Sequence, residues 1–435
     1  MSNRTYSNLA QVYTSLAEAK LDEPDVGAVQ KRDICVILHQ ALDLFDQCLK
    51  MQEQELQDAQ RLETQPIPAS SPDTSLETPV EPDSDPEGTM EEVWASVAEP
   101  VTEDTLIDTC LAKLDALKIL CNVQPSGSAN DLRAIEEIFV TGLNGKLDIL
   151  GQKVHRSRDI ALGRIAFLVA FAIARFRIHH ADIQSLEHDS HQALQETQPF
   201  FPKKDDAEAL CIIAENHTDI NAAIEEGLSR NGSTAEVLSI SNRIRWQHIT
   251  KALEHYGLAS QIPGVHKLAQ IHLLRGDSEL LRARLGDEPS YYDLAIQNRP
   301  TLLKNAAVYY DAARKAMTNQ NHFSDANDDR LEVEIKLRVV TDLLDNQPIE
   351  SQSSLMQSPS GIQVLSDMRD HGLLHTAALS MIERKLGVQV WNNSRAHPLG
   401  HVNPVMPCWR VSEWDNEGNF CRSHGAEGSK GPGAA

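Results

Sequence analysis

The sequence predicts an all-α protein, and three observations support this. Leu, Ala, Glu and Gln are abundant, and these side chains lose little rotamer freedom in a helix, whereas aromatic residues make up only 5% of the chain. Apolar residues recur at i, i+3 and i+4 over most of the length, and no alternating run predicts a strand. With 435 residues and 41% hydrophobic content, the chain is long enough for two or three buried cores.

The first predicted elements are two helices, residues 6–20 and 29–60, which are separated by Pro24 and Gly27. The second helix has one wide apolar stripe, formed by Ile34, Leu38, Ala41, Leu42, Phe45, Cys48 and Leu49. Residues 1–62 are therefore expected to form a helical hairpin. Residues 63–92 contain six prolines and almost no bulky apolar side chain, which predicts a disordered acidic linker.

Helical periodicity resumes after the linker, so residues 93–386 are expected to form a helical domain. After a first helix around Leu106 to Leu120, the predicted helices are 130–150, 159–178, 182–196, 205–216, 219–230, 233–256, 265–274, 278–285, 291–297, 301–317, 328–344 and 361–386. Gly and Pro residues separate most of them. Residues 387–435 lack helical periodicity and are interpreted as a disordered tail or the product of an altered gene model.

The charge restricts the choice of partner. The formal net charge is -23, and residues 62–112 hold thirteen Asp and Glu but no Lys or Arg. Nucleic-acid binding requires clustered cations, so we expect no nucleic-acid partner. A basic protein partner suits this charge better.

We expect the chain to be located in the cytoplasm, with the nucleus as the alternative. No secretory signal is apparent at the start, and the seven cysteines are widely spaced without a CxxC pair, which favours reduced thiols. The longest apolar run, residues 165–174, is about half a membrane span, so no membrane partner is expected.

The tripeptide Arg275-Gly276-Asp277 has the sequence of a cell-adhesion signal. In a chain without an export signal we interpret it as a turn between two helices. Gly276 would supply the permissive backbone conformation, and Asp277 would cap a helix that begins at Ser278.

The spacing of the short helices resembles the tetratricopeptide repeat (TPR) superfamily, whose unit is a helix-turn-helix of 34 residues. The resemblance is clearest over residues 267–317, weaker over 6–52, and carried only by helix rhythm between them. The matched positions are Leu268, Ala269, Gly276, Asp277, Leu281, Leu285, Ala295 and Pro300, then Ala307 and Tyr310, and Ala41 and Phe45 in the first hairpin. The chain also resembles a poorly characterised group of fungal TPR proteins.

This resemblance implies a TPR-like α-solenoid of antiparallel hairpins whose concave face holds a partner peptide or a basic protein. The groove candidates are His266, Gln270, Lys304 and Asp311. The family's lysine and asparagine clamp for terminal carboxylates is incomplete, because Val308 occupies the asparagine position that goes with Lys304. The implied function is a non-catalytic scaffold or assembly chaperone. A structural subunit of a larger complex and an enzyme with an unrecognised all-α site remain as alternatives.

No nucleotide-binding, hydrolase or zinc-protease motif occurs, so no catalytic residue, cofactor or metal is predicted. Four histidines, His179, His180, His188 and His191, are interpreted as a solvated helix face, because only His188 and His191 have the spacing of ligands on one helix face. Arg156, Arg158 and Arg164, with residues 175–180, form a basic cluster. It is interpreted either as a solvated helix edge or as a dock for the acidic linker.

Overall fold

A computed structural model shows that all regular structure in the residues it describes is helical, as the composition predicts. The structure describes residues 2–21, 23, 26–64, 100–123, 129–179, 182–197, 206–231, 234–265, 267–287, 290–318, 326–345 and 358–374. None of the helices in this part of the chain is long and apolar enough to cross a membrane. The five cysteines within it, Cys35, Cys48, Cys110, Cys121 and Cys211, are free thiols.

The chain divides into two units, residues 1–201 and residues 202–435. This division differs from the predicted one at the acidic linker, because helices on both sides of the linker share one core. Most of the predicted linker 63–92 and all of the predicted tail 387–435 lie outside the described residues.

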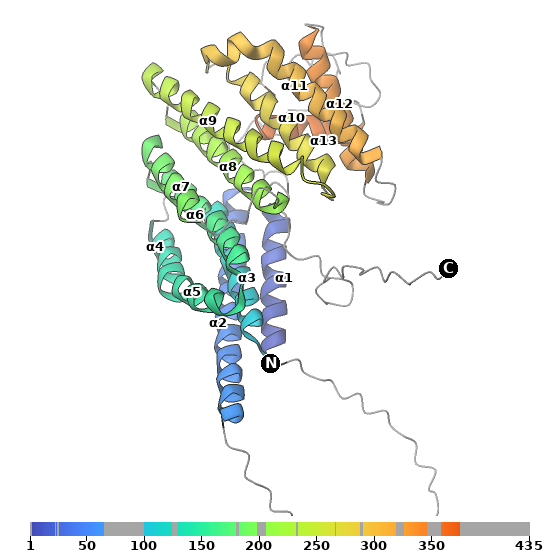
Figure 1. Ribbon diagram of the computed structural model, residues 1–435. Coiled ribbons are helices and arrows are strands. Elements are labelled where there is room, and N and C mark those ends of the chain that lie inside the picture. Colours follow the sequence, from blue (N-terminus) through green and yellow to red (C-terminus); the bar gives the residue numbers. More distant parts are fainter. Residues whose placement is uncertain are drawn as a thin grey trace, which may run out of the picture. The chain divides into compact units, whose positions relative to one another are not determined.

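Unit 1 starts with an antiparallel hairpin, as predicted (Figure 1). Its helices are α1 Asn3–Leu21, α2 Ala28–Thr64, α3 Glu103–Val123, α4 Ala129–Glu137, α5 Gly145–Val154, α6 Ser157–His179 and α7 Ile183–Thr197, with the π-helix η1 Ile138–Asn144 between α4 and α5. The start of α1 lies beside the second half of α2, where the Asn3 amide donates to Glu55 at 2.7 Å and the Cys48 thiol donates to the Asn3 carbonyl at 3.3 Å.

The predicted apolar stripe of α2 is buried and packs with α3 and α6 into the core of unit 1. Phe45 is fully buried, and Ala41 beside it is small enough to let a neighbouring helix come close. The last turns of α2 extend beyond the other helices of the unit, and residues 57–62 are exposed (Figure 1). The polar sequence after Leu56 therefore projects from the core.

Unit 2 contains helices that each pack against the next one in the chain. They are α8 Ala207–Asn231, α9 Ala235–Ala259, α10 Leu268–Arg284, α11 Asp293–Thr318, α12 Ala326–Leu344 and α13 Pro359–Asp370. Polar contacts show that α8 and α9 are antiparallel: His217 bonds His248 at 2.9 Å, and Asn221 accepts from Arg245 at 3.0 Å.

Three predicted breaks are wrong, because single helices α8, α10 and α11 run through them. In α11, Pro300 lies inside the helix and does not terminate a repeat. Pro300 cannot donate to the carbonyl of Ile296, but both residues are exposed, so water can bond to that carbonyl instead. A proline on the solvent side of a helix therefore did not mark its end.

The turn predicted at Gly276 and Asp277 is also wrong, since both residues lie buried in the middle of α10. A Cβ atom on Gly276 would overlap the ring of Tyr310 from α11, at 2.6 Å from Cδ1. Glycine is thus needed here for the close approach of an aromatic ring, and its backbone conformation is helical. Asp277 caps no helix, because its carboxylate accepts from the Tyr310 hydroxyl at 2.8 Å.

Arg275 has an internal role too. Its guanidinium lies over the ring of Tyr309 with Cζ 4.0 Å from the centroid, and it donates to the Tyr309 hydroxyl at 3.0 Å. A second donation, at 2.9 Å, reaches the Ser260 hydroxyl at the end of α9. All three residues of the tripeptide are therefore used in packing α10 against its neighbours.

Replacing Gly276 by Ala tests this packing. The new methyl group must displace the Tyr310 ring, so we expect Gly276→Ala to lower the free energy of unfolding by about 1–3 kcal/mol. Gly257→Ala is the matched control: Gly257 also lies within a helix, but its added Cβ would meet only Arg275 Nη2 at 4.0 Å. Helix propensity should make this control more stable by roughly 0.5–1 kcal/mol. Urea unfolding, followed by circular dichroism, measures the free energy of unfolding of both variants. Equal changes in the two variants would contradict the close packing of Tyr310 against Gly276.

Unit 2 should lose stability in acid. Burial lowers the pKa of His255, His272 and His371, so the unfolded chain binds protons at these positions at a pH where the folded chain does not. The stability contributed by the neutral histidines is therefore full above the unfolded pKa of about 6.5 and decreases as the pH falls below it.

Hydrogen exchange of α9 and α10 peptides, measured at about pH 7.5 and about pH 5.5 and corrected for intrinsic exchange, tests this decrease. We expect the loss of stability between these two pH values to be smaller in His272→Gln than in the unaltered chain. The control is His191→Gln, at an exposed position of α7. A decrease that is identical in both variants would show that other groups cause it.

Candidate functional site

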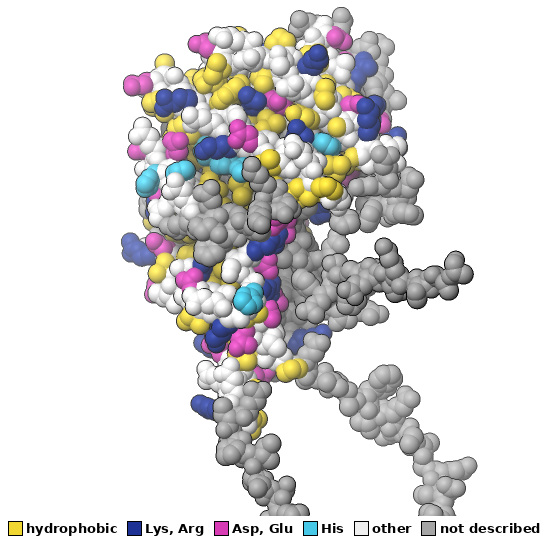
Figure 2. Space-filling model, viewed as in Figure 1, with side chains coloured by type: hydrophobic (Ala, Val, Ile, Leu, Met, Phe, Trp, Pro, Cys, Tyr) yellow, Lys and Arg dark blue, Asp and Glu magenta, His cyan; other side chains and the backbone are white. Residues whose placement is uncertain are grey.

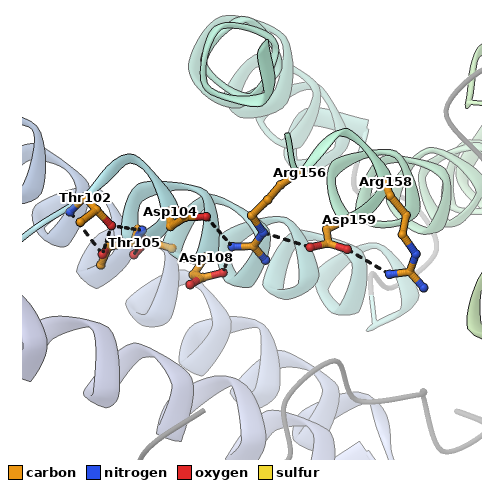
Figure 3. Close-up of polar contacts among 8 residues, drawn as sticks. Thr102, Asp104, Thr105, Asp108, Arg156, Arg158 and Asp159 are labelled. Carbon is orange, nitrogen blue, oxygen red and sulfur yellow. Dashed lines mark hydrogen bonds and ion pairs between the residues drawn. The ribbon is translucent and has the colours of Figure 1, made fainter. Parts of the chain in front are cut away.

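The predicted basic cluster at residues 156–180 proves to be a mixed charge cluster at the beginnings of α3 and α6 (Figure 3). The sequence starts α3 here because Thr102 caps it: the Thr102 hydroxyl accepts from the backbone N–H of Thr105 at 3.3 Å. Asp104 and Asp108 follow at i and i+4, which places them on one face of α3.

Arg156 joins the two helices. His155 ends α5 in a left-handed conformation with φ of 56°, and the chain then turns into α6. The Arg156 guanidinium bonds Asp108 at 2.5 Å and lies 3.8 Å from Asp104, and its Nε donates to Asp159 at 3.0 Å. Asp159 accepts from Arg158 as well, also at 3.0 Å. Three carboxylates thus share two guanidinium groups.

The pKa values follow from this arrangement. Burial raises the pKa of Asp108, although the bond and the charge of Arg156 act in the opposite direction. For Arg156, burial lowers the pKa, but the bonds to Asp108 and Asp159 outweigh it and raise the value overall. The guanidinium therefore remains charged at any physiological pH.

The carboxylates of this cluster remain accessible to solvent. The side chains of Asp104 and Asp108 are 55% and 56% exposed. Asp115, seven residues after Asp108, lies on the same face of α3 and is 50% exposed, with Lys118 4.0 Å away. We call these three residues, Asp104, Asp108 and Asp115, the α3 acidic face. A carboxylate with one bound cation can still accept from another donor, so this face can bind Lys or Arg side chains of a partner.

Two further arginines of the predicted basic cluster also have acidic partners. Arg164 pairs with Asp148 at 2.7 Å, and Arg175 pairs with Asp189. In the face shown in Figure 2, Lys and Arg side chains likewise lie close to Asp and Glu side chains. Most of the linker that was the alternative occupant of this cluster lies outside the described residues, and Arg156, Arg158, Arg164 and Arg175 already have carboxylate partners within unit 1.

Three of the four groove candidates lie in the part of the chain that the structure describes. His266 lies outside the described residues, Gln270 is half-buried on α10, and Lys304 is exposed on α11. Asp311 pairs within its own helix with Arg314 and with Lys315, the latter at 2.7 Å, and the bond to Lys315 lowers the pKa of Asp311. No hydrogen bond or ion pair among the described residues joins any two of Gln270, Lys304 and Asp311.

Most of the residues matched to the repeat lie in the cores. Those that are buried are Ala41, Phe45, Ala269, Gly276, Asp277, Leu281, Leu285, Ala295 and Tyr310. Leu268 and Ala307 are half-buried, and Pro300 is exposed. The buried ones support the helix packing of the two units.

The histidines at 179–191 are partly described. His188 and His191 are exposed on α7, and His191 bonds Gln195 at 2.8 Å. The side chains of His179 and His180 lie outside the described residues. In the described part of the chain, no group of three or more His, Cys, Asp or Glu side chains is placed to hold a metal ion.

Sequence reasoning missed the α3 acidic face as a site. The spacing of Asp104 and Asp108 was visible, and Thr102 marked the start of the helix, but Arg156 comes 48 residues after Asp108. Comparison of the chain with protein-family models, with curated proteins and with solved structures found no match.

Proposed function

We propose that this protein is a non-catalytic scaffold or assembly chaperone that holds a basic protein partner on unit 1. The α3 acidic face carries the proposal, because its three half-exposed carboxylates are fixed on a helix and two of them are oriented by Arg156. Fixed acceptors lose little conformational freedom when a Lys or Arg side chain binds.

The distribution of charge supports the choice of unit 1. Residues 1–201 contain 33 Asp and Glu against 16 Lys and Arg, whereas residues 202–435 contain 30 against 24. Most of the excess of acidic over basic residues therefore belongs to unit 1. A field of this sign attracts basic partners and speeds their association.

A TPR-like α-solenoid is the architecture proposed for this scaffold. Its support is the packing order of unit 2, in which α8 to α12 each contact the next helix in the chain, as stacked helical hairpins do. The turn at Gly276 no longer supports it, because α10 is continuous there. The proposed location is the cytoplasm, with the nucleus as the alternative.

Affinity capture with the full chain tests the function. The test variant removes the α3 acidic face by Asp104→Asn, Asp108→Asn and Asp115→Asn. The control removes three exposed acids of unit 2 by Glu236→Gln, Glu254→Gln and Asp293→Asn, so both variants lose the same charge. Circular dichroism confirms that each variant folds.

We expect the unaltered chain and the control to capture a basic protein, with pI above about 9, and the test variant to lose most of it. Capture should also fall between about 0.05 M and about 0.3 M NaCl, because salt screens exposed charges. Capture of many subunits of one large complex, independent of charge, would identify a structural subunit instead. Turnover in a metabolite screen without a protein partner would indicate an enzyme.

A further inference from the structure

The last helix of unit 2 in the described chain, α13, is amphipathic. Gly361, Leu365 and Met368 follow one another at i, i+4 and i+7 and are buried, whereas Gln363 on the opposite side is exposed. Leu365 and Met368 belong to the same apolar cluster as Val340 of α12, and α13 packs mainly against that helix. Helices that bind to grooves of other proteins use apolar anchors with this spacing.

The two ends of α13 have caps made from its own residues. At the start, the Ser358 hydroxyl accepts from the backbone N–H of Gly361 at 3.0 Å. At the end, the backbone N–H groups of Gly372 and Leu373 donate to carbonyls of the last turn at 2.8 Å and 2.7 Å, and Gly372 has a left-handed φ of 66°. This arrangement is a Schellman motif. The caps of the helix therefore belong to residues 358–373 themselves.

Arg284, at the end of α10, holds the end of α13. Its guanidinium donates to the Gly372 carbonyl and pairs with Glu225 of α8 at 2.9 Å. The Glu225 carboxylate also accepts from Arg245 of α9 at 2.7 Å. A Cβ atom on residue 372 would collide with Arg284 Nη1 and would lie 3.3 Å from Glu225 Oε2. The contact with Arg284 therefore requires glycine at this position.

Leu373 and Leu374 continue the apolar contact beyond the helix. Both are 3% exposed and belong to the cluster that holds Leu365 and Met368. We call the part of unit 2 that these four side chains cover the α13 contact surface. It contacts side chains at fixed positions and, through Arg284, one backbone carbonyl, so a pattern defines its occupant. The pattern is two apolar residues at i and i+3 of a helix, a glycine four residues after the second, and two apolar residues directly after the glycine.

We propose that α13 is an intramolecular ligand of unit 2, and that an amphipathic helix of a partner protein with the same pattern replaces it on the α13 contact surface. As the last described helix, α13 packs mainly against one neighbour, and such elements open at a lower free energy than the rest of a domain. When α13 leaves, the covered apolar side chains of unit 2 and the Arg284 guanidinium become available together. This surface belongs to unit 2, so the proposal can fail independently of the proposed partner on the α3 acidic face of unit 1.

Hydrogen exchange of the full chain tests whether α13 separates from unit 2. Gly372→Ala pushes Arg284 away. Arg284→Met removes the bond to Gly372 directly, and Glu225 keeps another arginine partner. Gly264→Ala is the matched control, because Gly264 also has a left-handed φ, 79°, but its added Cβ would meet nothing within 4 Å. We expect exchange in α13 to rise about tenfold or more in both test variants and to stay unchanged in the control, with α10 and α11 still protected. Unchanged exchange in α13, or loss of protection throughout unit 2, would overturn the proposal.

A peptide of residues 358–374, labelled with fluorescein, serves as the probe for a partner helix. Fluorescence anisotropy should show about tenfold or more tighter binding to the Gly372→Ala chain than to the unaltered chain, because bound α13 lowers the fraction of molecules with a free contact surface. The peptide with Leu365→Ser and Met368→Ser should not bind, since it lacks both anchors. If the Gly372→Ala chain releases α13 but does not bind the unaltered peptide, the proposal is wrong. A dimer of this variant that excludes the peptide would identify a second copy as the occupant and would likewise contradict a partner helix.

Discussion

The carboxylate of Asp277 connects three helices of unit 2, and the packing around α10 depends on it. Its Oδ1 accepts from the Tyr310 hydroxyl of α11 at 2.8 Å, and its Oδ2 accepts from the Lys336 ammonium of α12 at 2.9 Å. Lys336 also pairs with Glu332 at 2.6 Å. Burial lowers the pKa of Lys336, but these two acids outweigh it and raise the value overall, so the buried group stays charged. Removing Lys336 would leave the Asp277 carboxylate without a cation in a poorly hydrated site, and removing Asp277 would leave Lys336 with Glu332 alone.

The two units thus use acidic side chains in different ways. In unit 2, Asp277 is 5% exposed and both of its oxygens bond side chains of the core, so a ligand from solvent cannot reach it. In unit 1, Asp104 and Asp108 are held by Arg156 at one side and reach solvent at the other. An Arg-Gly-Asp sequence is therefore structural here, whereas an unremarkable pair of aspartates forms the better candidate for recognition.

The sequence predicted the helices well and their boundaries less well. Apolar periodicity depends on local sequence, so α1, α2 and α12 were found nearly complete. Gly276 and Pro300 were misinterpreted because their roles depend on the fold. Gly276 is needed because the ring of Tyr310, 34 residues further along the chain, packs against it. Pro300 is tolerated inside α11 because it faces solvent. The charge cluster in unit 1 depends on Arg156, which comes 48 residues after Asp108. No local sequence pattern therefore linked Arg156 to α3. The π-helix η1 has no pattern in the sequence that indicates it.

A double-mutant cycle on Asp277 and Lys336 tests most directly whether the tripeptide is structural. The variants are Asp277→Asn, Lys336→Met and the two together, and the free energy of unfolding is measured from hydrogen exchange of α10 and α11 peptides in urea. We predict that Lys336→Met destabilises unit 2 by about 3–5 kcal/mol and that Asp277→Asn destabilises it by less, because Lys336 keeps Glu332 as a partner. The double variant should lose clearly less than the sum, because it removes both charges of the Asp277–Lys336 contact. Small and additive effects would contradict this account, since they would mean that Asp277 does not hold α10 to its neighbours.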